Sequence, residues 1–208
     1  MAIIISGEKQ LLHFLGTEDE AARLNFREFC KRHSIRPIEA SAADLRTKIS
    51  TLLVLAETVF EADSKDAEDE PEFGDFEQKN TELFLLSGFN PQDRDQLLKA
   101  MQEEELGKNA LKAMATKHNI HWTLGHLLQD VSREHEIVSA YMELRQTLHV
   151  TGILIETVGL PPQAKEEFDV RYERGKNIIE SGMMPDDPEL MRRLTKELKI
   201  LITMGEDN

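Results

Sequence analysis

The sequence predicts an α/β (α+β) fold: two βαβα repeats form one four-stranded mixed sheet covered by helices, and a C-terminal helical extension follows. Short apolar runs alternate with longer segments of helical periodicity, and this alternation occurs twice, in residues 11–60 and 83–135. A strand–helix–strand unit requires a parallel pair of strands with a right-handed crossover. Two such units side by side make a four-stranded sheet, with the helices most simply on one face.

The second repeat shows this order most clearly. The apolar run 83–86 is flanked by turn-forming residues, which predicts a buried strand. Asn90 and Pro91 have the character of an N-cap and a first helical residue, and this helix is expected to stop at Gly107. Residues 110–115 then predict a second strand.

The first repeat follows the same order with different residues. Residues 11–16 (LLHFLG) parallel residues 83–88 (LFLLSG), and each run predicts a strand that ends near a glycine. Thr17 is expected to cap the next helix, because the three acidic residues after it complement the positive end of the helix dipole. Residues 37–40 predict the second strand of this repeat.

The helix that closes each repeat has two capping candidates. These are Ser41 or Asp44 in the first repeat and Asn119 or Thr123 in the second. Apolar residues recur at three- and four-residue spacing after both, which predicts amphipathic helices. Because the complete order of elements occurs twice, the sequence predicts an internal duplication.

The second repeat also carries a spaced set of polar and aromatic residues: Lys112-Ala113, Thr116, Asn119, Trp122 and a closing Glu134-His135. This set resembles the K-A-x-x-T-x-x-N-x-x-W … E-H signature of the domain-of-unknown-function 3783 family, which consists of small bacterial proteins. The resemblance is specific over about residues 83–135 and weaker over residues 11–82. It implies no catalytic residue, because the family has no established activity. The chain continues well beyond His135, where such a protein is expected to end.

Turn-forming residues and changes in composition along the chain predict four segments. They are a first βαβα half (1–62), an acidic linker (63–80), a second βαβα half carrying the motif (81–149) and a helical extension (150–208). Residues 1–7 lie outside the repeat and form either an added edge strand or an irregular start. The extension either packs on the sheet or forms an arm that pairs with a second copy, and the sequence leaves both open.

Composition restricts the classes of function. The formal net charge of −14 repels phosphate backbones, so we expect no nucleic-acid partner. No apolar run approaches the ~20 residues that cross a bilayer, so no membrane association is expected. The apolar run 2–6 is too short for a signal peptide, and the single cysteine, Cys30, fits a reducing compartment. We therefore expect a cytoplasmic protein.

The acidic linker has two interpretations. It is a solvated connection, or it is an acidic peptide that engages a basic partner through Phe73 and Phe76 as anchors. Its carboxylates lack the spacing of an EF-hand loop, so they do not predict a calcium site.

Two residues of the motif could also take part in chemistry. Lys112 could be a desolvated amine for phosphate or carbonyl chemistry, or its stem could lie along the sheet with its head in solvent or near a carboxylate. Trp122 could stack on a ligand or act as a packing anchor at the start of a helix.

The histidines and the cysteine predict no reactive site. Four histidines surround the last helix of the second repeat without a Cys or a paired carboxylate at zinc-ligand spacing: His118, His121, His126 and His135. No metal is therefore expected. Cys30 lies near the apolar side of its helix, which indicates an inert core thiol.

Two functions from different classes remain. We favour a non-enzymatic interaction or regulatory module that self-associates or binds a protein through the linker or the C-terminal helices, with no cofactor. The alternative is a small-ligand or enzymatic site collected from five motif residues: Lys112, Thr116, Asn119, Trp122 and His135. The first is favoured because no convincing catalytic constellation is visible, although distant residues can converge in the fold.

Overall fold

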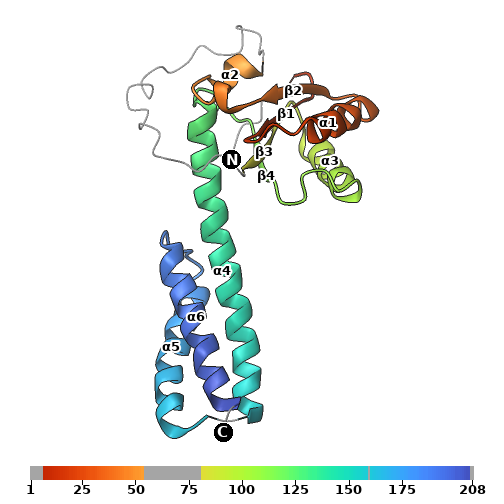
Figure 1. The fold of residues 1–208 in the computed structure, drawn as a ribbon. Helices are drawn as coiled ribbons and strands as arrows, with labels where there is room; N and C mark the ends of the chain where they lie inside the picture. Colours follow the sequence, from red (N-terminus) through yellow and green to blue (C-terminus); the bar gives the residue numbers. More distant parts are fainter. Residues whose placement is uncertain (1–6, 54–80, 159, 207–208) are drawn as a thin grey trace. The chain divides into compact units, whose positions relative to one another are not determined.

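A computed structural model describes residues 7–53, 81–158 and 160–206 (Figure 1). The chain divides into two compact units, Met1–Ser132 and Arg133–Asn208. Helix α4 (Leu124–Val158) begins in the first unit and continues into the second. The boundary expected between residues 149 and 150 falls inside this helix. The acidic linker, with Phe73 and Phe76, and nearly all of the possible N-terminal strand lie outside the described residues.

A four-stranded mixed sheet forms the centre of the first unit, as predicted. Its order is β2-β1-β3-β4. The strands β1 and β2 are parallel, β3 and β4 are parallel, and β1 and β3 are antiparallel. The four strands have these bounds: β1 Gln10–Leu15, β2 Arg36–Ala40, β3 Glu82–Ser87 and β4 Leu111–Met114. Each predicted repeat therefore supplies one parallel pair, and the two pairs meet along their first strands.

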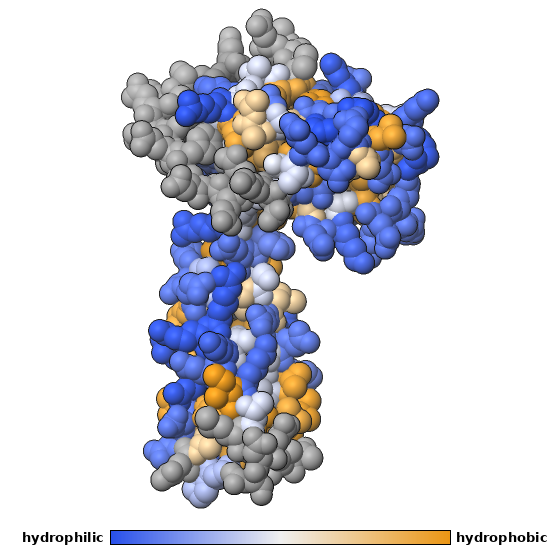
Figure 2. All heavy atoms as spheres, viewed as in Figure 1, coloured by the Kyte–Doolittle hydropathy of each residue, from blue (hydrophilic) through white to orange (hydrophobic). Residues whose placement is uncertain are grey.

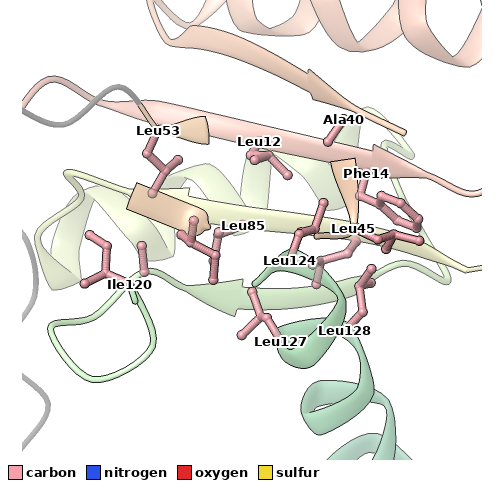
Figure 3. Close-up of a cluster of buried hydrophobic side chains, with 13 residues drawn as sticks. Leu12, Phe14, Ala40, Leu45, Leu53, Leu85, Ile120, Leu124, Leu127 and Leu128 are labelled. Atoms are coloured by element: carbon pink, nitrogen blue, oxygen red, sulfur yellow. The ribbon is translucent and has the colours of Figure 1, made fainter. Parts of the chain in front are cut away.

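Helices cover both faces of this sheet, so the expectation of a single covered face was wrong. One buried cluster joins alternate strand residues to α1 (Glu20–Arg32) and α3 (Pro91–Glu103). The other cluster joins the remaining strand residues to α2 (Ile49–Leu52) and to the first turns of α4 (Figure 3). The physical reason is visible in β3, where four successive apolar residues are all buried. An unbroken apolar strand requires cover on both sides.

The predicted starts and ends of the long helices are partly confirmed. The side chain of Asn90 accepts a hydrogen bond from the backbone N–H of Asp93 (2.8 Å), so it caps α3 as expected. Asp19, not Thr17, caps α1, since its carboxylate accepts from the Ala22 N–H at 3.0 Å.

The predicted end of α3 at Gly107 was wrong, because the helix stops at Glu103. Gly107 is needed by the loop that follows. Its φ is +58°, and a Cβ at this position would lie 2.2 Å from Cε2 of Phe84. Only glycine combines that backbone conformation with so close an approach.

The two halves of the first unit correspond at the ends of their first helices. Ser34 and Glu105, which follow the C-caps of α1 and α3, both have a φ of 54°. The C-cap residues themselves, His33 and Glu104, lie 2.8 Å apart at their side chains. Corresponding residues therefore meet each other where the halves join, as they do in a two-fold symmetric pair.

The alignment of residues 11–16 with residues 83–88 was one residue out of register. Leu11 belongs to the cluster with α1 and α3, and so does Phe84, whereas Leu83 belongs to the opposite cluster. Leu11 therefore corresponds to Phe84 rather than to Leu83. A shift of one residue moves a strand side chain to the other face of the sheet. The sequence did not reveal this shift, because both faces of these strands carry apolar residues.

The second unit has an apolar core of its own. It is formed by the later part of α4 with α5 (Pro162–Glu180) and α6 (Pro188–Glu206). The buried apolar residues of this core are Ala140, Leu144, Leu148, Phe168, Met191, Leu194, Leu198 and Leu201. These eight side chains of the second unit thus pack against one another. No helix in the described ranges combines the length and the hydropathy that a membrane crossing requires.

Candidate functional site

Lys112 lies on β4 at the edge of the sheet, where its amine serves the preceding loop. Its Nζ donates hydrogen bonds to the carbonyl oxygens of Gly107 (2.8 Å) and Ala110 (3.2 Å). Burial lowers the pKa of Lys112, and the negative charge of Glu82 opposes this shift. Two of the three ammonium donors are thus engaged by backbone, so the geometry favours a structural role for this side chain.

Thr116 and Asn119 form a closed turn after β4. The side-chain oxygen of Asn119 accepts from the Thr116 N–H (2.8 Å), and its amide nitrogen donates to the Met114 carbonyl (3.0 Å). The Thr116 hydroxyl accepts from the Asn119 N–H (3.3 Å). These bonds use both ends of the Asn119 amide within its own turn. The two motif residues therefore shape the backbone.

The first half contains the same turn with different residues. The carboxylate of Asp44 accepts from the Ser41 N–H (2.8 Å), and the Ser41 hydroxyl accepts from the Ala43 N–H (3.3 Å). Ser41 thus caps a single 3₁₀ turn, η1 (Ala42–Asp44), while α2 begins after Lys48. The corresponding long helix in the second half is capped by Thr123, whose hydroxyl accepts from the His126 N–H (3.3 Å).

These two turns lock the halves together through reciprocal backbone hydrogen bonds. The Ile49 N–H donates to the Trp122 carbonyl (3.0 Å), and the Leu124 N–H donates to the Thr47 carbonyl (3.0 Å). In a second reciprocal pair, the Ser50 N–H donates to the Ile120 carbonyl (2.9 Å), and the Gly125 N–H donates to the Leu45 carbonyl (2.9 Å). Carbonyl groups of the second half therefore accept hydrogen bonds from the first half, and N–H groups of the second half donate to carbonyl groups of the first.

Trp122 lies between two histidine rings beside this lock. Its ring centroid is 5.2 Å from that of His118 and 4.4 Å from that of His126. The indole is partly buried against the cluster that contains α2 and the start of α4. It therefore acts as a packing anchor. Within the described ranges, no group of three or more His, Cys, Asp or Glu side chains is placed to hold a metal ion.

The remaining motif residues do not join this turn. Glu134 and His135 are exposed and belong to the second compact unit. Two open depressions, of about 440 Å³ and 450 Å³, are lined by residues of that same unit. Neither depression is lined by any of the six motif residues.

Sequence patterns did not single out His13, which is the buried histidine of β1. Its Nε2 lies 2.8 Å from a carboxylate oxygen of Glu82, and its ring stacks on Phe84 at 4.5 Å. The side chain is 1% exposed, and its Nδ1 has no hydrogen-bond partner among the residues that the structure describes. Only the pairing of β1 with β3 brings this histidine and its carboxylate together.

The exposed apolar side chains were also missed by sequence reasoning. Among the described residues, the large apolar side chains that face solvent belong to the second unit, with Leu24 as the one exception. They are Val138, Met142, Val150, Ile153, Val170, Met183, Met184 and Ile200. Figure 2 shows apolar surface interspersed with hydrophilic surface over the C-terminal helices. Helical periodicity alone did not separate the side chains that face the core from those that face water.

The segment that contains the closed turn is similar to a described family of domains. Residues 82–138 match the family model of DUF3783, a domain of unknown function. The resemblance seen in the sequence is thereby confirmed over this segment. No curated protein and no solved structure matches the chain.

The DUF3783 match begins at β3 and ends within α4. It therefore covers the second half of the sheet and leaves out the first half, so the weaker resemblance over residues 11–82 stays a prediction. In the DUF3783 segment, the polar atoms of Thr116 and Asn119 are satisfied by backbone groups.

Proposed function

We propose that this protein is a non-enzymatic interaction module and that its partner binds the second unit, Arg133–Asn208. The observation that carries the proposal is the concentration of exposed apolar side chains on that unit. Neighbouring exposed apolar groups, such as Val138 and Met142 on α4, mark interaction surfaces more often than singly scattered ones do. In the first unit, by contrast, the side chains of Lys112 and Asn119 form hydrogen bonds with nearby backbone groups.

The face of α4 that carries Val138 and Met142 is the most direct candidate surface. These two side chains are 39% and 53% exposed and lie one helical turn apart, so they project from the same side of the helix. Covering a fully exposed side chain of this kind stabilises a complex by about 1.5–3 kcal/mol. Partial burial of both side chains would therefore contribute measurably to affinity.

The alternative of a ligand site around Lys112, Thr116, Asn119, Trp122 and His135 has less support. The Lys112 amine and the Asn119 amide already bond to carbonyl groups of neighbouring residues. A ligand that recruited them would have to replace those bonds, which costs free energy wherever a buried polar group is left unpaired.

We also propose a cytoplasmic location and no nucleic-acid partner. The net charge of −14 disfavours phosphate backbones, and a buried lone cysteine suits a reducing compartment. Fractionation of cells and filter binding with duplex DNA test the two statements. Recovery of the protein outside the cytoplasm, or salt-sensitive DNA binding, would contradict them.

The interaction is tested by a quantitative pull-down with the full chain. Wild type, Val138→Asp/Met142→Asp and the control Leu24→Asp are compared, and sedimentation velocity reports self-association of each. Leu24 is a matched control because it is 52% exposed and belongs to the other unit. We expect a partner, or a second copy, that binds wild type and the control and is lost from the double variant. Identical partners and identical sedimentation for all three proteins would refute the proposal.

A further inference from the structure

The exposed side of α6 is cationic in a chain that is strongly acidic overall. Arg192, Arg193, Lys196 and Lys199 are all exposed, and Glu189 is an exposed anion in the first turn of the same helix, whereas the net charge of the chain is −14. Salt screens charges beyond about 8–10 Å at physiological ionic strength, so a nearby ligand responds mainly to this local set. The side of α6 that faces water is thus attractive to anions in spite of the net charge.

The same side of α6 borders an open groove of about 440 Å³. Its lining includes Glu143 from α4 and, from α6, Arg192, Thr195, Lys196, Lys199 and Ile200. This volume lies in the range of about 300–1,000 Å³ that is usual for ligand sites. The groove is therefore large enough for side chains of another molecule.

Part of the positive charge in the groove is not neutralised. Lys199 pairs with Glu143 at 2.8 Å, and Arg192 pairs with Glu189 at 2.6 Å. Lys196 and the neighbouring Arg193 form no ion pair with any of the described residues. Lys196 is thus the unpaired cation of the groove lining, and Arg193 lies outside that lining on the same helix.

An apolar side chain indicates what else a ligand would contact. Thr195 also lines the groove, but its side chain is only 3% exposed and its hydroxyl oxygen is buried, so a ligand does not reach it. Ile200 lines the groove and is 43% exposed, so it offers apolar contact beside the cations.

We infer that this α6 groove binds an acidic peptide segment of a partner protein. Its carboxylates bond to Lys196 directly and to Arg192 in exchange for Glu189, and its apolar side chain covers Ile200. The inference rests on the proposed function and specifies the chemistry of the partner. A purely inorganic anion would leave Ile200 uncovered. The cations supply specificity and a fast encounter, and the apolar contact supplies burial.

The experiment measures fluorescence anisotropy of a labelled 14-residue peptide of glutamate and leucine, with the leucines at helical spacing, against the full-length protein. Arg192→Gln/Lys196→Gln is compared with Lys165→Gln/Lys176→Gln on α5. Both double variants remove two positive charges from exposed residues of the same unit, but Lys165 and Lys176 lie outside the groove lining. Circular dichroism confirms that each variant is folded.

We expect the groove variant to weaken binding at least about fivefold and the α5 variant less than about twofold. Binding to wild type should weaken as salt is raised, and Ile200→Ser should weaken it further. No binding to wild type, or equal loss in both double variants, would overturn the inference. So would a 14-nucleotide uridine RNA that binds the groove more tightly than the peptide.

The outcome can be separated from that of the proposed function. If the peptide fails to bind while Val138→Asp/Met142→Asp still loses its partner, the module stands and the acidic chemistry is wrong. If the peptide binds the groove while that apolar variant keeps its partner, the α4 face is wrong and the α6 groove stands.

Discussion

At the scale of single residues, Thr116 and Asn119 of the motif form a turn. Asn119 closes its turn with both ends of its amide, and Asp44 closes the equivalent turn of the first half with a carboxylate. The two residues differ in one respect, because only the asparagine can donate a hydrogen bond. Asn119→Asp therefore serves as a control that keeps the acceptor and removes the donor.

Replacement of Asn119 should therefore lower stability in a graded way. Asn119→Ala removes the acceptor for Thr116 N–H and the donor to Met114, and we expect a loss of about 1–2 kcal/mol in the free energy of unfolding. Asn119→Asp keeps the acceptor, as in Asp44, and should lose less. Urea denaturation followed by circular dichroism measures both variants. Equal losses would show that the acceptor does not matter.

Cys30 should be chemically inert in the native protein. It is fully buried, and burial raises the pKa of its thiol to about 12. Thiolate is the reactive form, so at pH 8 both access and ionisation oppose reaction. We expect Ellman's reagent to react slowly with native protein and rapidly in guanidinium chloride. Because the chain has one cysteine, the signal reports this site alone. Rapid native reaction would contradict the burial of α1 against the sheet.

At the scale of elements, a charge cluster ties α1 to the edge strand β2. Glu39 on β2 accepts from Nη2 of Arg27 (2.8 Å) and from Nη1 of Arg23 (3.3 Å), both on α1. The hydrogen bond to Arg27 is the main cause that holds the pKa of Glu39 below its usual range, and Arg23 adds to it. The ionised form is therefore bound more strongly in the folded than in the unfolded chain.

The sign of this shift predicts how stability depends on pH. A depressed carboxyl pKa stabilises the fold above the unfolded value of about 4.3, and this contribution is lost as pH falls through the folded value. Glu39→Gln should thus cost about 1 kcal/mol at pH 7, and this cost should shrink as pH falls through the folded pKa of Glu39.

The control for Glu39 is Glu28→Gln, since Glu28 is exposed on α1 and forms no ion pair with the described residues. Thermal unfolding between pH 2 and pH 7 gives the comparison. A difference between wild type and Glu39→Gln that stays constant over this range would exclude the ion cluster as its cause.

At the scale of the whole molecule, each unit depends on its own core. Leu85 lies at the centre of the sheet cluster, and Leu198 lies in the core of the helical unit; both are fully buried. Removing a buried leucine side chain typically costs about 2–5 kcal/mol. We expect each substitution to lower the stability of the unit in which the leucine lies.

Hydrogen exchange followed by mass spectrometry tests this independence. Leu198→Ala should raise exchange in α5 and α6 and leave β1 and β3 unchanged, whereas Leu85→Ala should do the reverse. The two variants serve as controls for each other. If either one raises exchange throughout the chain, the two units unfold together.

The order of elements in the first unit was readable from the sequence alone. Apolar runs marked the first strand of each half, and residues 37–40 and 110–115 were predicted as the second strands. Asn90 with Pro91 marked the start of α3 correctly. The family motif was also readable, and the match over residues 82–138 agrees with it. These features are local, because strand length, helical spacing and capping each depend on a few neighbouring residues.

Tertiary structure alone decided the faces, the register and the use of the motif. Leu11 and Leu12 are both apolar, so only the packed helices show which face each one joins. The motif looked like a possible ligand site until the fold placed backbone carbonyls and N–H groups around Lys112 and Asn119. Hydrogen-bond satisfaction and exposure depend on partners distant in the chain. The sequence therefore determined the parts and their order, and the packing determined which side chains are left to meet another molecule.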